Sequence, residues 1–354
     1  MKPRISRASQ QQLRTELLLP PDAEIDDGLR WSEVIMRITH RMGLAVGVML
    51  IVIGVTRPLE AQDLLSESLS WFPPQTIALE YSSPSTLRSL PNYESLRAHY
   101  LGRNLKTLEA SLAELGIHES DIDEMTLGWE AAGGKTMQYE GLAAGRFDAA
   151  SMDQHATAAG IAPHPVAGFK AYCLPSDPNS SCVVILDSSL GMFGPLPILR
   201  GMLQARQGQG PNIGSNAQFT DLVHSAQSDA PIWGVALGQA VAKWFKAWMP
   251  GEKNFQMDWA TAFKDVSALS YRIEAGDNVQ LHVKLDCASE QGASSVRQLL
   301  EGLKLLQQLA WHTTNPNQPN PFQNIEVEAA NRQVSLNMTA DYAALEHVGP
   351  LGKP

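Results

Sequence analysis

Apolar residues recur with two different spacings between residues 70 and 345, and these spacings predict alternating strands and amphipathic helices. Residues 76–81 follow Pro73-Pro74 and are rich in β-forming side chains, so they predict the first strand. A long helix is predicted next, because five leucines recur at steps of three and four before Gly116: Leu101, Leu105, Leu108, Leu112 and Leu115.

Paired runs of β-forming residues predict antiparallel hairpins. The pairs are residues 123–131 with 137–147, the segments on either side of Cys173 and Cys182, residues 267–275 with 278–288, and residues 324–330 with 333–341. Within residues 279–285 apolar and polar positions alternate strictly, which indicates a strand with one buried face.

Helices are predicted between these hairpins. Asp148 and Gly160 bound one helix, Asn216 caps another, and residues 239–249 form a third. A second long amphipathic helix is predicted from one apolar stripe: Val296, Leu299, Leu300, Leu303, Leu306 and Leu309.

The order of these elements predicts an α+β fold, with antiparallel sheets and helices packed on one face. Residues 70–230 and residues 231–345 both run through a strand, a helix, a hairpin and a further helix. That repeated order suggests two related halves, which a diverged duplication would explain.

Residues 42–56 form an apolar run without a charged side chain, inside a segment that spans residues 36–61. The run is shorter than the roughly 20 residues that cross a bilayer, and its length and basic flank are typical of a signal peptide cleaved after Ala61. An uncleaved anchor and a buried core helix are the two alternatives. Residues 1–35 are polar, and we expect a disordered leader there or a true start at Met36 or Met42.

Charge and cysteine content narrow the class of protein. The chain carries a net charge of −10 without a basic stripe, which argues against nucleic acid as a partner. A protein or another envelope component is the expected partner, and the membrane is contacted only through residues 42–56 if they stay uncleaved. A turn-rich segment separates Cys173 from Cys182, so a hairpin would bring them together, and an oxidising compartment would then join them in a disulfide. Cys287 is left single.

The chain resembles a group of exported bacterial proteins of uncharacterised function over residues 70–250. The resemblance lies in the strand that follows the apolar segment, in the strand-to-helix step GRFDAA, and in the LDSS segment before a helix. It implies an exported α+β domain and brings no catalytic residue with it.

No motif in the sequence predicts catalytic, cofactor-binding or metal-binding residues. Residues 128–136 (GWEAAGGKT) lack the first glycine of a phosphate-binding loop, since Trp129 stands in its place. Ser215 is better explained as part of a helix cap than as a nucleophile. Asp153, His155 and His164 have no metal-ligand spacing, and residues 118–124 are typical of a solvated acidic loop rather than a calcium loop.

Trp244, Phe245 and Trp248 crowd one face of the predicted helix over residues 239–249. Such a face usually packs into the core, and if exposed it would be a candidate partner surface. The sequence therefore predicts a non-catalytic, exported envelope protein that acts as a binding or assembly module. The alternatives are a single-pass, membrane-anchored accessory subunit and a hydrolase whose site the sequence does not reveal.

Overall fold

The computed structural model describes residues 61–90, 92–100, 103–130, 138–174, 181–248, 257–315 and 318–347. The predicted leader (residues 1–35) and the apolar run (residues 42–56) lie outside the described residues. No helix in the described part is long and apolar enough to span a bilayer.

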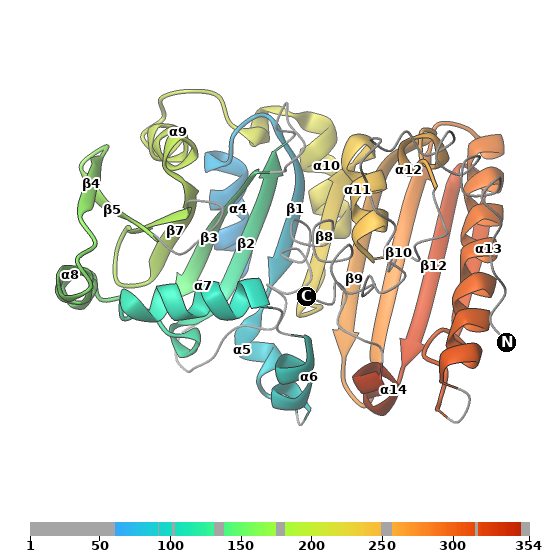
Figure 1. The fold of residues 1–354 in the computed structure, drawn as a ribbon. Coiled ribbons are helices and arrows are strands. Elements are labelled where there is room, and N and C mark those ends of the chain that lie inside the picture. The colour runs from blue at the N-terminus through green and yellow to red at the C-terminus, as the bar shows by residue number, and fades with distance from the viewer. Residues whose placement is uncertain are drawn as a thin grey trace, which may run out of the picture. The chain divides into compact units, whose positions relative to one another are not determined.

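The strands form one antiparallel sheet with the order β11-β12-β10-β9-β8-β1-β2-β3-β7-β6-β5-β4 (Figure 1). Their bounds are β1 Thr76–Ser82, β2 Ile122–Glu130, β3 Gln138–Gly145, β4 Pro163–Val166, β5 Phe169–Cys173, β6 Ser181–Ile185, β7 Leu190–Pro195, β8 Ile232–Leu237, β9 Val266–Ala275, β10 Val279–Cys287, β11 Ile325–Ala330 and β12 Gln333–Ala340.

Helices connect these strands and cover them (Figure 1). Their bounds are α4 Ala61–Trp71, α5 Pro84–Leu87, α6 Tyr93–Tyr100, α7 Arg103–Glu114, α8 Ala149–Ala158, α9 Leu196–Arg206, α10 Ala217–Ala226, α11 Gly238–Trp248, α12 Trp259–Ala262, α13 Glu290–Thr314 and α14 Tyr342–His347.

The strand order is symmetric about the central pair β1 and β8. Moving outward from β1 the sheet continues through β2, β3, β7 and β6, and moving outward from β8 it continues through β9, β10, β12 and β11. In each half, a hairpin lies outside the third strand counted from the centre: β7 and β6 lie outside β3, and β12 and β11 lie outside β10. The first half goes further than the second, because β5 and β4 extend the sheet beyond β6.

The central strands are buried on both faces. Ala78 and Leu79 are consecutive residues of β1 that belong to different apolar clusters, one on each side of the sheet. Ala78 packs in the cluster that includes residues of α11, α12 and α13, whereas Leu79 packs in the cluster built with α4, α9 and α10. The α+β class with antiparallel strands is confirmed, and the structure adds that helices cover both faces.

Most predicted elements are present, and the capping residues behave as expected. The Asp148 carboxylate accepts from the backbone N–H groups of Ala150 and Ser151, and the Asn216 side chain accepts from the N–H of Phe219. Strands β4 and β7, helix α4 and the short helices α5, α6, α12 and α14 have no counterpart in the predicted order of elements. Proline and glycine are disfavoured in strands, so the prolines of β4 and the glycines of β7 argue against a strand at the level of sequence.

Candidate interaction surface and buried carboxyl groups

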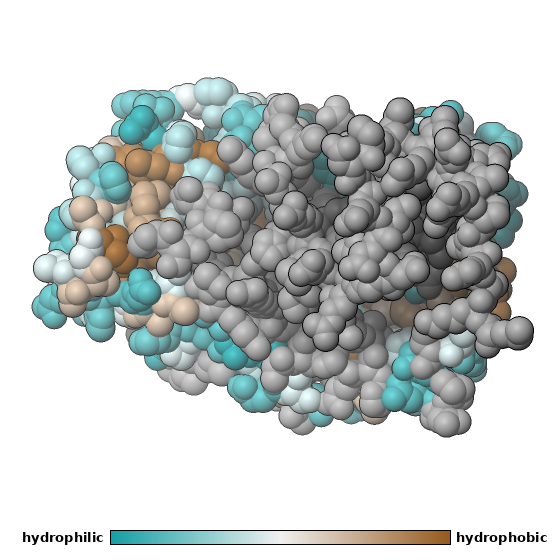
Figure 2. All heavy atoms as spheres, viewed as in Figure 1, coloured by the Kyte–Doolittle hydropathy of each residue, from teal (hydrophilic) through white to brown (hydrophobic). Residues whose placement is uncertain are grey.

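Three leucines on the second half of α13 are exposed to solvent. Leu305, Leu306 and Leu309 expose 57%, 49% and 64% of their surface. At about 100° of rotation per residue they lie on the side of the helix that faces away from the sheet. We call these three residues the leucine surface. Figure 2 shows hydrophobic residues beside hydrophilic ones near the lower part of α13.

The opposite side of α13 is fixed to the sheet. Val296, Leu300 and Leu303 are buried in the cluster that α13 shares with β10, β11 and β12. The end of the helix is held through Phe322: its carbonyl accepts from Gln308 at 2.9 Å, and its ring meets Trp311 edge to face. The leucine surface therefore stands on a helix whose position is set by core packing.

The predicted apolar stripe of this helix needs a correction at its end. The stripe predicts Leu306 and Leu309 on the buried face, together with Val296 and Leu303, but both are exposed. Trp311, which is 7% exposed, is the buried residue at this end of the helix instead. An apolar residue placed at every third position drifts around the helix, since three residues turn it by only about 300°.

The face of β9, β10 and β12 opposite α13 carries polar side chains. Arg272, His282 and Asn337 form one row across these strands, because His282 pairs in register with both of the others. The Nδ1 atom of His282 lies 2.8 Å from Oδ1 of Asn337, and Nε of Arg272 donates to Glu274 at 2.8 Å. Glu326 of β11 continues this row to the edge of the sheet.

Two glutamates are fully buried, one on each face of the sheet. Glu80 of β1 is 3% exposed and accepts a hydrogen bond from the Tyr271 hydroxyl. Glu140 of β3 has no exposed surface, and its Oε1 accepts from Thr76 Oγ1 at 2.8 Å. Within the described residues, the second oxygen of each carboxyl group has no hydrogen-bond partner. Neither residue was a predicted site residue.

Burial raises the pKa of both carboxyl groups, because a charged carboxylate is poorly solvated inside the protein. The pKa of Glu80 rises to about 8, opposed by the hydrogen bond from Tyr271. The pKa of Glu140 also rises to about 8, opposed by the hydrogen bond from Thr76. Burial likewise raises the pKa of Glu124 to about 7, with a hydrogen bond to Tyr81 acting in the other direction.

Glycines make room for the side chains that cross between strands. A Cβ atom at Gly234 of β8 would lie 2.7 Å from the Tyr271 ring and hydroxyl, so the tyrosine passes over β8 to reach Glu80 on β1. A Cβ atom at Gly141 of β3 would lie 2.1 Å from the Phe193 ring. These buried contacts stabilise the centre of the sheet, and we assign them no catalytic role.

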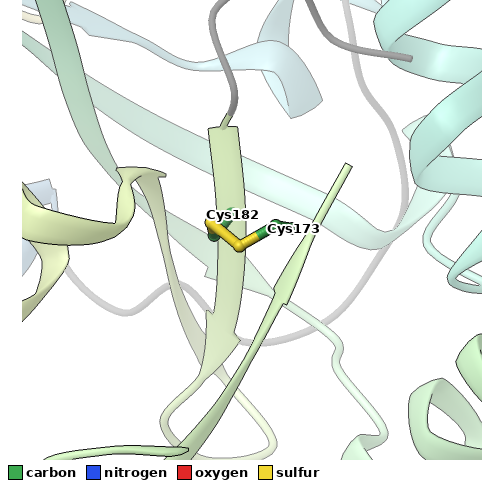
Figure 3. Close-up of a disulfide and its surroundings, with 2 residues drawn as sticks. All are labelled: Cys173 and Cys182. Carbon is green, nitrogen blue, oxygen red and sulfur yellow. A yellow bond between two sulfur atoms is a disulfide. The ribbon is translucent and has the colours of Figure 1, made fainter. Parts of the chain in front are cut away.

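The predicted disulfide is present. Cys173 at the end of β5 and Cys182 of β6 are joined by an S–S bond of 2.02 Å, with their Cα atoms 3.7 Å apart (Figure 3). The two residues are direct cross-strand partners, as the hairpin prediction requires. Cys287 is a free, buried thiol.

The predicted aromatic face of α11 is described only in part. Phe245 is 6% exposed and stacks on Phe263 of the neighbouring segment with ring centroids 4.3 Å apart. This residue packs into the core. The side chains of Trp244 and Trp248 lie outside the described residues, so a role for them as a partner surface stays a prediction.

The other residues considered from the sequence lie apart from one another in structural settings. The Asp153 carboxylate pairs with Lys170, and the His155 ring packs beside Gly116. Ser215 donates to the carbonyl of Asn212 at 2.7 Å, directly before the Asn216 cap. Most of residues 128–136 lie outside the described part of the chain. Among the described residues, no group of three His, Cys, Asp or Glu side chains is arranged to hold a metal ion.

Comparisons with known proteins give a distant structural likeness. No family model matches the chain, and no curated protein matches it. Crystal forms I and III of TP0453 match with TM-scores of 0.47 and 0.46 at 10% sequence identity. The match covers 79% of this chain and 95% and 96% of the TP0453 chains.

Proposed function

We propose that the protein is a non-catalytic binding or assembly module of an extracytoplasmic compartment. The observation that carries the binding role is the leucine surface of α13. Three leucines within two turns expose about half of their surface or more, on a helix whose other side is packed into the core. Soluble proteins seldom gather large apolar side chains on a fixed surface unless a partner covers them. A protein partner is the expected occupant.

The compartment is supported by the disulfide between Cys173 and Cys182. Disulfides persist in oxidising compartments and are rare in the reducing cytosol. Alkylation of thiols in intact cells of the native host tests this. We expect Cys173 and Cys182 to resist alkylation until a reductant is added, and ready labelling of both without reductant would contradict the proposed compartment.

Photo-crosslinking in the native host tests the binding role. A photoreactive residue at Leu306 or Leu309 should crosslink to discrete protein species, because a partner covers this surface. The same residue at Gln204, an exposed position of α9, serves as the control and should give no such species. Crosslinks that are absent from both leucine positions, or equal to those from Gln204, would refute the binding role of α13.

A membrane-anchored accessory subunit is the second candidate, favoured by the apolar run at residues 42–56. The two candidates differ in whether that run is removed. Helix α4 begins at Ala61 and buries Leu64, Leu65 and Leu69, so cleavage after Ala61 would leave its packed residues in place. The intact mass of protein from the native host decides between them. We expect a chain that starts near Gln62, and a mass that includes residues 42–56 would favour the anchored subunit.

A further inference from the structure

Strand β11 has an open edge in the described part of the chain. It pairs with β12 on one side and is the last strand of the sheet on the other. The carbonyl of Asn324 accepts from the N–H of Thr339 at 3.3 Å, so the even-numbered residues of this segment bond to β12. Hydrogen-bonding direction alternates along an antiparallel strand, so Ile325, Val327 and Ala329 point their backbone N–H and C=O groups outward.

The first half of the fold shows what that edge can accept. Strand β6 holds the position in its half that β11 holds in the other, at the outside of the terminal hairpin. There β5 adds to β6, with Tyr172 opposite Val183 and Cys173 opposite Cys182. The same architecture therefore supports a further strand at this position, and the described second half supplies none.

The opposite edge of the sheet is formed by β4, which is poorly suited to pairing with a further strand. Strand β4 spans only Pro163–Val166 and contains two prolines, Pro163 and Pro165, which have no N–H to donate. Short, proline-bearing edge strands resist pairing with another chain. Strand β11 contains no proline, so its outward N–H groups remain able to donate.

The charge on β11 determines which kind of strand can pair with it. Glu326 and Glu328 are exposed on one face, and their partners on β12 are the neutral residues Asn337 and Ser335. A second copy pairing antiparallel about Val327 would set Glu326 against Glu328, and like charges on opposed strands are destabilising. A strand with a cation at alternate positions would instead meet both carboxylates.

We propose that β11 binds an extended segment of a partner protein that carries Lys or Arg at alternate positions, and that this segment adds to the sheet as a further strand. Backbone hydrogen bonds to β11 provide affinity, and the two glutamates provide selectivity. The side chains of the segment that lie between its cations fall on the other face of the sheet, where Ile325 and Val327 pack under α13. Apolar residues are therefore expected at those positions of the segment. The inference rests on the proposed binding function, because it names the chemistry of the partner.

Synthetic peptides of defined pattern test the proposal on the full protein. The probe is an acetylated octapeptide that alternates lysine with valine. Its controls are a glutamate–valine octapeptide and a peptide of the same composition with lysines and valines in separate blocks. We expect the alternating basic peptide to bind in a salt-sensitive way and to slow amide exchange at Ile325, Val327 and Ala329. Equal binding of all three peptides, or slowed exchange only elsewhere, would overturn the proposal.

Two variants of β11 make the test specific. Glu326→Lys with Glu328→Lys should weaken binding of the basic peptide at least about tenfold, from the loss of two favourable cross-strand pairs, and should admit the glutamate–valine peptide. Ala329→Pro removes an outward N–H that β12 does not use, at an exposed position, so it should weaken binding of either peptide with little change in the melting temperature. Unaltered binding by both variants would contradict the proposal.

A matched control and a separate readout complete the design. Asp221→Lys with Asp229→Lys changes the net charge by the same amount at exposed positions away from β11, and binding should be unchanged. Should Ala329→Pro fail to fold, the charge reversal still decides the outcome. If no peptide binds while Leu306 crosslinks to a partner, the strand-addition proposal fails and the proposed function stands.

Discussion

Replacing Glu140 with glutamine should change how the stability of the protein depends on pH. Glu140 is fully buried, and its one hydrogen bond in the described part of the chain comes from Thr76. Its pKa is raised from 4.5 to about 8. Between these values the carboxyl group is neutral in the folded protein and ionised in the unfolded chain. Its contribution to stability is therefore complete below pH 4.5 and is lost as the pH rises through about 8.

The size of the effect follows from that difference in protonation. One proton bound by the folded state and absent from the unfolded state changes the free energy of unfolding by about 1.4 kcal/mol per pH unit. Over the full window the loss reaches about 5 kcal/mol, which is comparable to the whole stability of many domains. Glu140→Gln keeps the shape of the side chain and removes the titration, so this part of the slope should disappear.

Urea denaturation at pH 5, 6 and 7 measures the slope. The wild type should become less stable with each step, and Glu140→Gln should lose about 1.4 kcal/mol per pH unit less than the wild type does. Glu94→Gln, at an exposed position of α6, is the control and should keep the wild-type slope. Identical slopes for Glu140→Gln and the wild type would refute the account of a buried, protonated Glu140.

Three further variants probe the packing and the disulfide. Gly234→Ala should displace the Tyr271 ring and cost about 1–3 kcal/mol in urea denaturation, and wild-type stability would contradict the crossing of Tyr271 over β8. Replacing both Cys173 and Cys182 with serine should lower the free energy of unfolding by about 2.5 kcal/mol, because the bond no longer restricts a loop of this length in the unfolded chain. If the variant and the wild type, both measured without reductant, are equally stable, the bond is contradicted. Phe245→Ala should cost about 3–5 kcal/mol by calorimetry, and a loss under about 0.5 kcal/mol would show that this residue is not core.

Features that depend on nearby residues could be predicted from the sequence. The helix cap at Asp148 and the hairpin turn between β9 and β10 are set by side chains within a few positions. The disulfide could be predicted for the same reason, since a turn-rich segment joins its two strands. Strand β4 could not be predicted, because Pro163 and Pro165 argue against a strand in the interior of a sheet. Only the position of β4 at the edge, which the sequence does not reveal, makes these prolines compatible with a strand.

Features that depend on distant segments could not be predicted. Glu80 and Glu140 are charged residues of strands, which normally indicates a solvent-facing position, and only the packing of remote helices buries them. The exposure of Leu306 and Leu309 depends on which side of α13 packs against the sheet. The open edge of β11 likewise follows from the order of strands across the whole sheet.

The binding role is the central claim, and one variant tests it most directly. Leu305→Gln, Leu306→Gln and Leu309→Gln together remove the leucine surface, and because all three residues are exposed, stability should change by no more than about 0.5 kcal/mol per site. Gel filtration of native-host extracts compares the variant with the wild type. The account predicts that the wild-type protein elutes in a larger complex and that the variant elutes as a free, folded chain. Identical elution of the two, with the melting temperature unchanged, would contradict it.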